Sequence, residues 1–322
     1  MRSGKMKKSP RLPNPAKPRY SLRRDLKMNW QLYLMAAPAV ILLFIFGYMM
    51  DFGAIMAFQE LDYNKGLFTS PFVGFKNFEY LFAGTTIWRV TRNTVFYNLA
   101  FMAVNSLTSI GLALIINEMT NKKVSKVIQT ILIMPYFLSM VVVSIIVYSF
   151  LAYNSGFLNN TLIKFGLDKQ NWYKMPEVWP YFIVFINMWK NVGFSSITYT
   201  AIISGIPQEY YEASTIDGAS RWQQCWKITL PHMKTIIAIG LINSLSAILS
   251  SDFDLFYVIT KNDGALYSTT QVLSTYTYNA LRSMSNLGMT AAAGLYVSFI
   301  GMLLVLLSNY VVKKIDPDSA MF

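Results

Sequence analysis

The sequence has little of what metal-dependent enzymes and disulfide-linked proteins rely on. Among its 322 residues there are one cysteine, Cys225, and one histidine, His232. A single cysteine excludes a disulfide framework. The motifs H-E-x-x-H, G-x-S-x-G, C-x-x-C and G-x-x-x-x-G-K-[ST] are all absent from the sequence. We therefore expect no metal site, no cofactor and no ATP bound through a P-loop by this chain.

Charged residues are also scarce. They make up 14% of the chain, against roughly 25% in an ordinary soluble domain. Hydrophobic residues make up 54%, and the mean hydropathy is +0.36. So few charges do not cover the surface of a soluble globule of this size, while the apolar content excludes intrinsic disorder. The composition therefore indicates a membrane protein.

The formal net charge of +12 is concentrated at the N-terminus. Residues 1–28 contain ten Lys and Arg against one acidic residue, Asp25, whereas the other 294 residues carry a net charge of only +3. The basic character is thus a tail in front of a nearly neutral body, which argues against nucleic-acid binding. We interpret residues 1–28 as a cytoplasmic tail that sets topology; contact with anionic lipid is the alternative.

Six apolar runs follow the tail, and each is close to the roughly 20 residues that a membrane-spanning helix needs. The first is too long for the apolar part of a cleaved signal peptide, and continuous runs do not fit a β-barrel. The sequence therefore predicts an all-α polytopic membrane protein with six transmembrane helices. The runs cover Leu32–Met50, Thr94–Asn117, Val127–Tyr153, Val178–Ile203, Ile236–Thr260 and Leu287–Val312.

The distribution of Lys and Arg predicts which side each loop lies on. With the N-terminal tail inside, the inside segments hold eighteen Lys and Arg and the outside loops hold nine. Cationic loops stay cytoplasmic, so both termini are expected in the cytoplasm. The outside loops are then residues 58–92, 154–177 and 261–286.

The inside segment 205–231, between the fourth and fifth runs, has the pattern of two short helices. Pro207 is placed to start the first helix, and Gly218 to stop it. Ser220, followed three residues later by Gln223, forms a capping box for the second helix. Pro231 is expected to end that helix and open the fifth span. We call residues 205–231 the elbow, and expect it to lie along the cytoplasmic membrane surface.

The elbow resembles the EAA motif of type I ATP-binding-cassette (ABC) importer permeases. The spacing of the motif's residues is the same over the twenty residues from Glu212 to Pro231. Two positions differ: Ser214 replaces the second Ala, and Cys225 stands where an aromatic residue is usual. The resemblance implies that the elbow is the coupling helix that docks on an ATPase subunit. Glu212 suits a charge-assisted hydrogen bond to an arginine of that subunit, and the alternative is a merely solvated Glu. The implied coupling residues are Glu212, Ala213, Ser214, Asp217, Gly218, Ala219, Ile228, Leu230 and Pro231.

Three other stretches resemble the carbohydrate branch of that family, close to the larger sugar-permease subunits of maltose-type and polysaccharide/lipoprotein-type systems. They are Phe72–Phe78 (FVGFKNF), Trp189-Lys190-x-x-Gly193, and the segment Leu266–Tyr276. The resemblance implies a MetI-like permease domain over residues 29–322 in a bacterial cytoplasmic (inner) membrane. It also implies a second homologous permease, two ATP-binding subunits that hold the ATP and Mg²⁺, an extracytoplasmic solute-binding protein, and an oligosaccharide substrate.

Polar residues on the fourth and fifth runs are the candidates for the substrate pathway. The candidates are Asn187, Lys190, Asn191, Asn243, Ser246, Ser250 and Asp254. Each run gathers them near one helical face if the run is a continuous helix. An ionisable residue at mid-membrane depth is a functional candidate by default, although Lys190 fits a structural pairing with a carboxylate equally well. The Ser and Asn side chains fit interhelical hydrogen bonds as an alternative.

Two other classes of function are open at this point. One is a channel or ion-coupled carrier that acts without ATPase subunits, and the other is an intramembrane enzyme built on Asp252 and Asp254. The i, i+2 spacing of these two aspartates places them on different faces of a helix, which disfavours the enzyme. The sequence does not name the saccharide, nor whether it is neutral or acidic.

Overall fold

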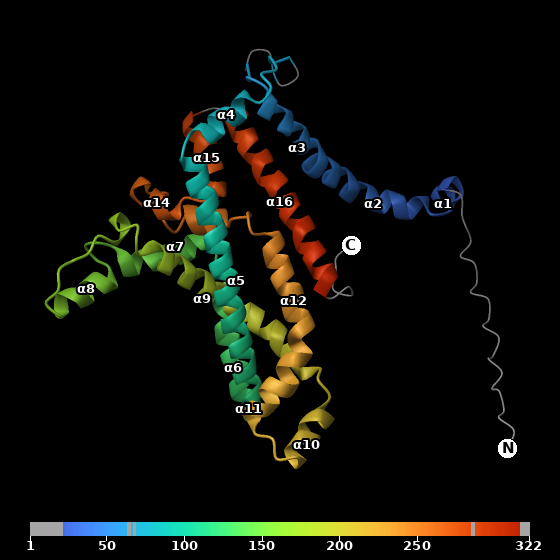
Figure 1. The fold of residues 1–322 in the computed structure, drawn as a ribbon, viewed down its shortest axis with the longest axis vertical. Coiled ribbons are helices and arrows are strands. Elements are labelled where there is room, and N and C mark those ends of the chain that lie inside the picture. The colour runs from blue at the N-terminus through green and yellow to red at the C-terminus, as the bar shows by residue number, and fades with distance from the viewer. Residues whose placement is uncertain (1–21, 63–65, 67–68, 285–286, 316–322) are drawn as a thin grey trace. The chain divides into compact units, whose positions relative to one another are not determined.

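The computed structural model describes residues 22–62, 66, 69–284 and 287–315 (Figure 1). Within these residues, regular secondary structure is helical apart from one isolated bridge between Gln59 and Phe72. The chain divides into two compact units, residues 1–53 and 54–322. Most of the predicted basic tail, residues 1–21, lies outside the described residues.

The first unit contains a nearly continuous apolar helix. A short helix α1 (Leu22–Met28) leads into α2 (Trp30–Leu43), followed by a π-helical turn (Phe44–Tyr48) and α3 (Met49–Asp51). Asp25 stabilises the junction of α1 and α2, because its carboxylate accepts hydrogen bonds from the Asn29 side-chain amide at 2.7 Å and from the Tyr33 hydroxyl at 2.6 Å. The apolar segment Trp30–Phe58 has a mean hydropathy of 2.1, so the first predicted span is helical.

The second unit is built on long helices joined by short ones. Its first half is α4 (Lys76–Ala83), α5 (Thr86–Glu118), α6 (Lys122–Ile133), a 3-10 turn (Met134–Phe137), α7 (Met140–Leu151), α8 (Phe157–Lys164) and α9 (Trp179–Ser204). Its second half is α10 (Gln208–Ile216), α11 (Arg221–Gln224), α12 (Leu230–Ser246), α13 (Phe253–Tyr257), α14 (Tyr267–Thr270), α15 (Leu273–Met284) and α16 (Leu287–Ile315). Figure 1 shows α10 and α11 at one end of this unit and α4 and α15 at the other.

Four described helices are long and apolar enough to cross a membrane. They are Trp30–Phe58, Thr86–Glu118, Arg221–Leu245 and Leu287–Leu307. A bent pair, Lys122–Phe137 with Met140–Leu151, makes a fifth if it counts as one span. The fourth predicted run, Val178–Ile203, is the 26-residue helix α9, which is not among the helices that are both long and apolar enough to cross a membrane.

The third and fifth predicted spans are broken, so their prediction as single helices over Val127–Tyr153 and Ile236–Thr260 was wrong. In the third, the helix axis turns by 99° after Phe137. In the fifth, α12 ends at Ser246 and a separate helix starts at Phe253 with Asp252 as its N-cap. Each break leaves backbone groups without helical partners, and those partners are supplied from other parts of the chain, as described below.

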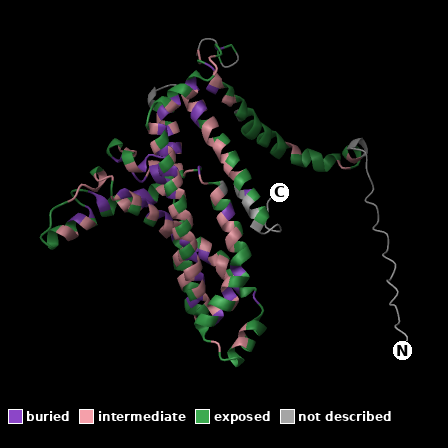
Figure 2. Cartoon of the chain, viewed as in Figure 1, coloured by how far each residue is buried: buried purple, intermediate pink, exposed green. Residues whose placement is uncertain are grey.

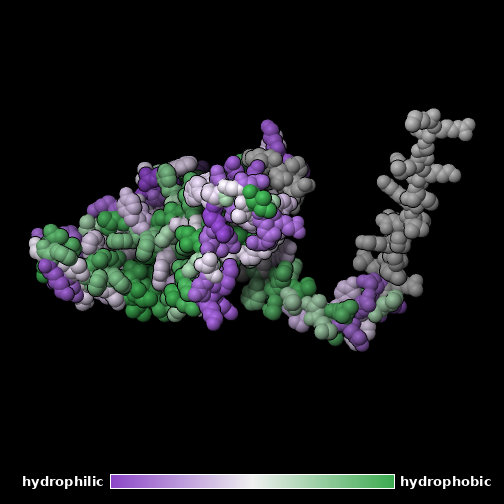
Figure 3. Space-filling model, turned by 90° about the horizontal axis from the view of Figure 1, so that it is seen from below, coloured by the Kyte–Doolittle hydropathy of each residue, from purple (hydrophilic) through white to green (hydrophobic). Residues whose placement is uncertain are grey.

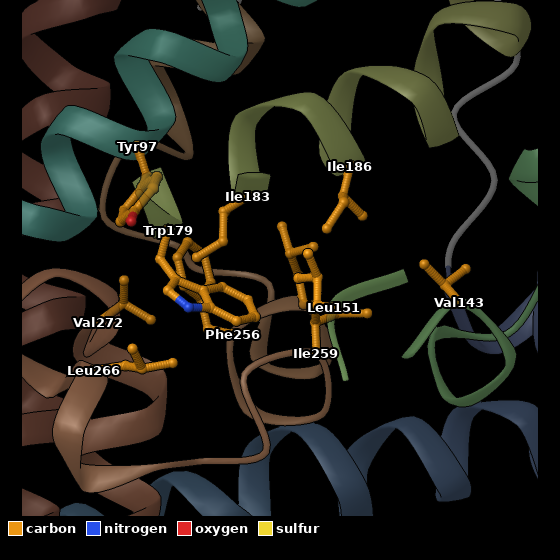
Figure 4. Packing of buried hydrophobic residues seen from close by; sticks show 11 residues of the cluster. Tyr97, Val143, Leu151, Trp179, Ile183, Ile186, Phe256, Ile259, Leu266 and Val272 are labelled. Carbon is orange, nitrogen blue, oxygen red and sulfur yellow. The ribbon is translucent and has the colours of Figure 1, made fainter. Parts of the chain in front are cut away.

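The largest buried apolar cluster lies where α9 meets α5 and α13 (Figure 4). Trp179 and Ile183 of α9 are fully buried, and Tyr97 of α5 packs edge-on against Phe256 with ring centroids 4.8 Å apart. Buried residues, purple in Figure 2, are most frequent in this region. The cluster fixes α9 against α5 and thereby places the polar faces of these two helices.

Large apolar side chains also cover much of the outer surface. Figure 3 shows extended hydrophobic areas on the face of the molecule that it presents. On the second unit, Leu107, Phe137 and Tyr181 are each exposed by more than 70%. Soluble monomers rarely expose so much contiguous apolar area, and a lipid environment accounts for it.

Candidate functional site

The first arm of the elbow is α10, and it ends in a glycine cap. Gly218 has a φ of +80°, a left-handed conformation that favours glycine. The Ala219 amide donates to the Ser214 carbonyl at 2.9 Å, and the Gly218 amide donates to the Thr215 carbonyl at 3.1 Å. This is the Schellman arrangement, so Gly218 ends the helix as predicted.

The second arm starts with the predicted capping box. The Gln223 amide donates to the Ser220 hydroxyl at 3.3 Å, and the Ser220 amide donates to the Gln223 side chain at 2.8 Å. The expectation that Pro231 ends this helix was wrong. A π-helical turn, Cys225–Thr229, carries the chain from α11 into α12, and Pro231 lies in the first turn of α12. Inside a continuous helical path a proline removes one backbone hydrogen bond, and the wider π-helical turn lies directly before it.

Gln224 joins the two arms, and the sequence pattern did not single it out. Its side chain is buried and donates to the hydroxyls of Ser214 and Thr215, at 2.9 Å each. A second link runs between the hydroxyls of Tyr211 and Thr229, 2.9 Å apart. Ser214, which departs from the family's Ala, therefore has a hydrogen-bonding role. These contacts fix the angle between the arms.

The acidic side of the elbow is exposed. Glu212, Ala213, Asp217 and Gly218 are exposed, and no heavy atom lies within 4 Å of the position that a Cβ on Gly218 would take. Among the other predicted coupling residues, Ser214, Ala219, Ile228 and Leu230 are partly buried and Pro231 is exposed. Trp222 and Trp226 are exposed by 70% and 56% and pack edge to face.

A polar cavity of about 420 Å³ lies between α5, α9 and α12. Of the predicted pathway residues whose side chains the structure describes, only Asn191 lines the cavity, and the α5 wall was not predicted from the sequence. Asn98, Asn105 and Ser106 fall on one face of α5, at offsets of seven and eight, and that spacing is the signal that could have found them. The full lining is Asn98, Phe101, Met102, Asn105, Ser106, Asn191, Ser195, Tyr199, Gly240, Ser244 and Ala247.

The amides at this cavity connect its walls. Asn187 is buried and accepts a hydrogen bond of 2.8 Å from Asn105, so it supports the cavity without lining it. The Asn105 side-chain oxygen is buried without a hydrogen-bond partner. Asn98 donates to the carbonyls of Ile248 and Ser250, at 3.0 and 2.8 Å, where the chain leaves α12. A remote amide thus satisfies the backbone at the break in the fifth span.

Lys190 stabilises the break in the third span through hydrogen bonds. Its ammonium donates to the carbonyls of Tyr136 at 2.9 Å, Leu138 at 2.5 Å and Pro135 at 3.4 Å. The predicted structural partner was a carboxylate, and the observed partners are backbone carbonyls. These carbonyls lie in the 3-10 turn Met134–Phe137 and at its C-cap, Leu138, and a cation is favoured at the C-terminus of a helix. In this conformation the contacts of Lys190 are structural, and its place on the substrate pathway stays a prediction.

Gly193 completes the same contact. A Cβ built on this glycine would lie 1.9 Å from the Leu132 carbonyl oxygen, so only glycine lets α9 approach the end of α6 so closely. Next to it, Phe194 stacks on Tyr136 with ring centroids 4.6 Å apart. The Trp189-Lys190-x-x-Gly193 motif thus packs α9 against the bend.

The remaining predicted pathway residues do not share one face. Asn243 is exposed on α12 and lies outside the cavity lining. The side chain of Ser246 lies outside the described residues. Ser250 and exposed Asp254 follow the end of α12, so the predicted continuous stripe over the fifth span was wrong.

At the end of the second unit that carries α4, Asn77 of the FVGFKNF stretch joins separate segments. Its buried amide donates to the carbonyls of Ala57 at 2.9 Å and Gln59 at 3.0 Å. Gly288 of α16 packs against it so closely that a Cβ would lie 2.6 Å from the Asn77 nitrogen. The stretch therefore fixes the start of α16 against α4.

The same end contains a turn with an unusual backbone. Lys261 and Asn262 both have positive φ values, 57° and 48°. The Lys261 ammonium lies 3.2 Å from the centroid of the Tyr148 ring, and burial lowers the pKa of this ammonium. Burial, together with the neighbouring Tyr148, raises the pKa of Tyr173 to about 12.

Among the described residues, no group of three His, Cys, Asp or Glu side chains is arranged to hold a metal ion.

Comparison with known proteins agrees with this architecture. The family model for "binding-protein-dependent transport system inner membrane component" matches residues 109–317. The polygalacturonan/rhamnogalacturonan transport system permease protein YteP of Bacillus subtilis is 31% identical over 289 residues, 89% of each chain. The trehalose/maltose transport system permease protein MalF of Thermococcus litoralis is 28% identical over 79% of this chain and 84% of its own.

Solved structures give the same result. A chain from a bacterial ABC transporter involved in the import of the acidic polysaccharide alginate has a TM-score of 0.83 and 33% identity, over 92% of this chain and 99% of its own. A chain from the bacterial alginate ABC transporter in complex with an alginate pentasaccharide-bound periplasmic protein has a TM-score of 0.82 and 33% identity, over 91% and 98%. The protein thus belongs to the binding-protein-dependent transport system inner membrane component family, and it is a membrane-spanning permease subunit of an ABC importer rather than an enzyme.

Proposed function

We propose that this chain forms one half of the translocation pathway of an oligosaccharide importer. The polar cavity between α5, α9 and α12 carries the proposal. Its asparagine, serine and tyrosine groups suit the hydroxyls of a sugar, and its volume lies within the range of ligand pockets, roughly 300–1,000 Å³. The names of relatives support the substrate class, since they include transport systems for polygalacturonan and for trehalose and maltose.

The proposed assembly contains a second homologous permease, two ATP-binding subunits and an extracytoplasmic solute-binding protein. The complex of the alginate transporter with its pentasaccharide-bound periplasmic protein supports the last of these. ATP and Mg²⁺ bind to the ATP-binding subunits, because this chain has no P-loop motif. The assembly lies in the cytoplasmic membrane of a bacterium.

The proposed topology has six spans and cytoplasmic termini. Four apolar helices and the bent pair supply five spans, and α9 supplies the sixth. Two polar residues inside α9 contact other helices: Asn187 accepts a hydrogen bond from Asn105, and Lys190 donates to the carbonyls at the bend. Within a bundle such residues do not meet lipid.

The elbow is the proposed site where the ATPase acts. Glu212 is exposed on α10, so it is available for a charge-assisted hydrogen bond to a partner arginine. Asp217, Gly218 and Ala213 are exposed beside it and permit close approach. Movement of the elbow then reaches α12, because α11 continues through the π-helical turn into that helix.

The test is oligosaccharide uptake by proteoliposomes that contain the complete importer. We expect uptake to require ATP, and Glu212→Lys to abolish it while the permease still inserts and assembles. Asp168→Lys, at an exposed position far along the chain from the elbow, is the matched control and should transport normally. Normal ATP-driven uptake by Glu212→Lys would contradict the coupling role. Uptake driven by an ion gradient without ATPase subunits would overturn the importer proposal in favour of a carrier.

A further inference from the structure

A second polar pocket, of about 740 Å³, lies at the end of the second unit opposite the elbow. We call it the arginine pocket. Its walls come from α4, the start of α5, the turn at Asn262, α14, α15 and the start of α16. It shares no lining residue with the polar cavity between α5, α9 and α12.

The arginine pocket has a positive lining. Arg89 and Arg282 both contribute to it, and none of the lining residues that the structure describes is an Asp or Glu. Arg89 makes one hydrogen bond of 3.3 Å, to the Gln271 side chain, and its Nε is buried without a partner. Arg282 is exposed and donates to the Tyr257 hydroxyl at 3.0 Å. Two arginines on a wall with no lining carboxylate among the described residues favour an anion that accepts hydrogen bonds from guanidinium groups.

The rest of the wall suits a sugar. Tyr80 presents a ring that is about half exposed, and Tyr267 and Asn279 are linked by a hydrogen bond of 3.1 Å. Asn279 is also paired with Asn262, at 3.0 Å, which fixes the amides in place. Aromatic faces and fixed amides recognise saccharide rings and hydroxyls, whereas a simple inorganic anion needs neither.

We propose that the arginine pocket binds a uronate unit of an acidic oligosaccharide, with Arg89 and Arg282 pairing with its carboxylate. This inference rests on the proposed function and names its substrate class as acidic. The pocket then acts before the polar cavity: it receives a charged sugar at the outer end and discriminates against neutral chains of the same length. The polar cavity, whose lining carries no charged residue, then serves the passage of the chain rather than its selection.

The experiment compares trigalacturonate with its neutral counterpart, α-1,4-galactotriose, as substrates of the complete reconstituted importer. Arg89→Gln and Arg282→Gln are the test variants, and Arg282 is exposed, so its replacement leaves the packing intact. Arg92→Gln is the matched control, because Arg92 lies one turn further along α5, is exposed and does not line the pocket. Uptake KM and saccharide-stimulated ATPase activity are measured for both probes.

We expect each test variant to raise the KM for trigalacturonate by roughly tenfold or more, the scale of one lost charge-assisted hydrogen bond. Arg92→Gln should leave this KM unchanged, and Arg282→Lys should restore part of the affinity. Unchanged KM values in both test variants would overturn the inference while uptake by the wild type upholds the proposed function. The inference would also be overturned if both variants weakened the docking of the saccharide-free binding protein on the importer to the same degree. The anion that pairs with the arginines would then be a side chain of that protein. If the wild-type importer takes up neither probe nor any neutral oligosaccharide, the proposed function itself fails.

Discussion

At the scale of single residues, the importer depends on side chains that satisfy backbone groups far away in the sequence. Lys190 donates to carbonyls about fifty residues earlier, and Asn98 donates to carbonyls about 150 residues later. An unsatisfied carbonyl costs more in a membrane than in water, because no solvent replaces the missing donor. Such residues therefore stabilise the fold alongside the apolar core.

Gly193 offers a test of this close packing. Gly193→Ala places a methyl group against the Leu132 carbonyl, so α9 must move away from α6. We expect the assembled permease to lose thermal stability by several degrees or to fail to assemble, because overpacking of a tight contact costs about 1–3 kcal/mol. The measurement is the unfolding temperature of the purified complex.

Gly111→Ala is the matched control for that variant. Gly111 also lies inside a long helix, but no heavy atom lies within 4 Å of the position its Cβ would take. Alanine is a better helix former than glycine by about 1 kcal/mol, so this variant should be neutral or slightly stabilising. Equal effects of the two variants would show that the contact with Leu132 is not what requires glycine.

At the scale of elements, the elbow is a preformed unit rather than a flexible loop. Gln224→Ala removes the donor that joins Ser214 and Thr215 to α11, and we expect the two arms to separate. Uptake should then fall severalfold, while the basal activity of the ATPase subunits is retained. Proteoliposome uptake and ATP hydrolysis, measured together, give the number of ATP molecules used per saccharide.

Gln223→Ala separates this effect from a general loss of helix. Gln223 takes part in the capping box but does not link the arms, so its loss costs one cap of about 1 kcal/mol. Its uptake per ATP should stay near that of the wild type. If Gln224→Ala also keeps its uptake per ATP, the link between the arms has no part in coupling.

Elements that depend on neighbouring residues were predictable from the sequence, and those that depend on distant residues were not. The Gly218 cap and the Ser220–Gln223 capping box are short-range patterns, and both were predicted. Lys190 stabilises the bend after Phe137, and Asn98 stabilises the break after Ser246. Both stabilising residues lie far away in the sequence, so neither interruption can be recognised from the residues around it. The α5 wall of the cavity was missed because its asparagines lie in a helix that is apolar overall.

At the scale of the whole molecule, the proposed six-span topology requires that α9 cross the membrane. Asp168 precedes α9 and Asp217 follows it, and both are exposed. In a Cys225→Ser background, we expect Asp168→Cys to react with a membrane-impermeant maleimide in right-side-out vesicles. Asp217→Cys should react only in inverted vesicles. Labelling of both positions from one side would contradict a sixth span at α9.

The continuous helical path from Arg221 to Ser246 has a mechanical consequence. Its near end belongs to the elbow, and its far end contributes Gly240 and Ser244 to the cavity. From Gln224 to Ser244 the path is about 30 Å long at 1.5 Å per residue. A rod of that length that pivots by about 10° carries its far end through about 5 Å, roughly one helical turn. If a partner tilts the elbow by that angle, the cavity wall at Ser244 therefore moves by about the width of a sugar ring.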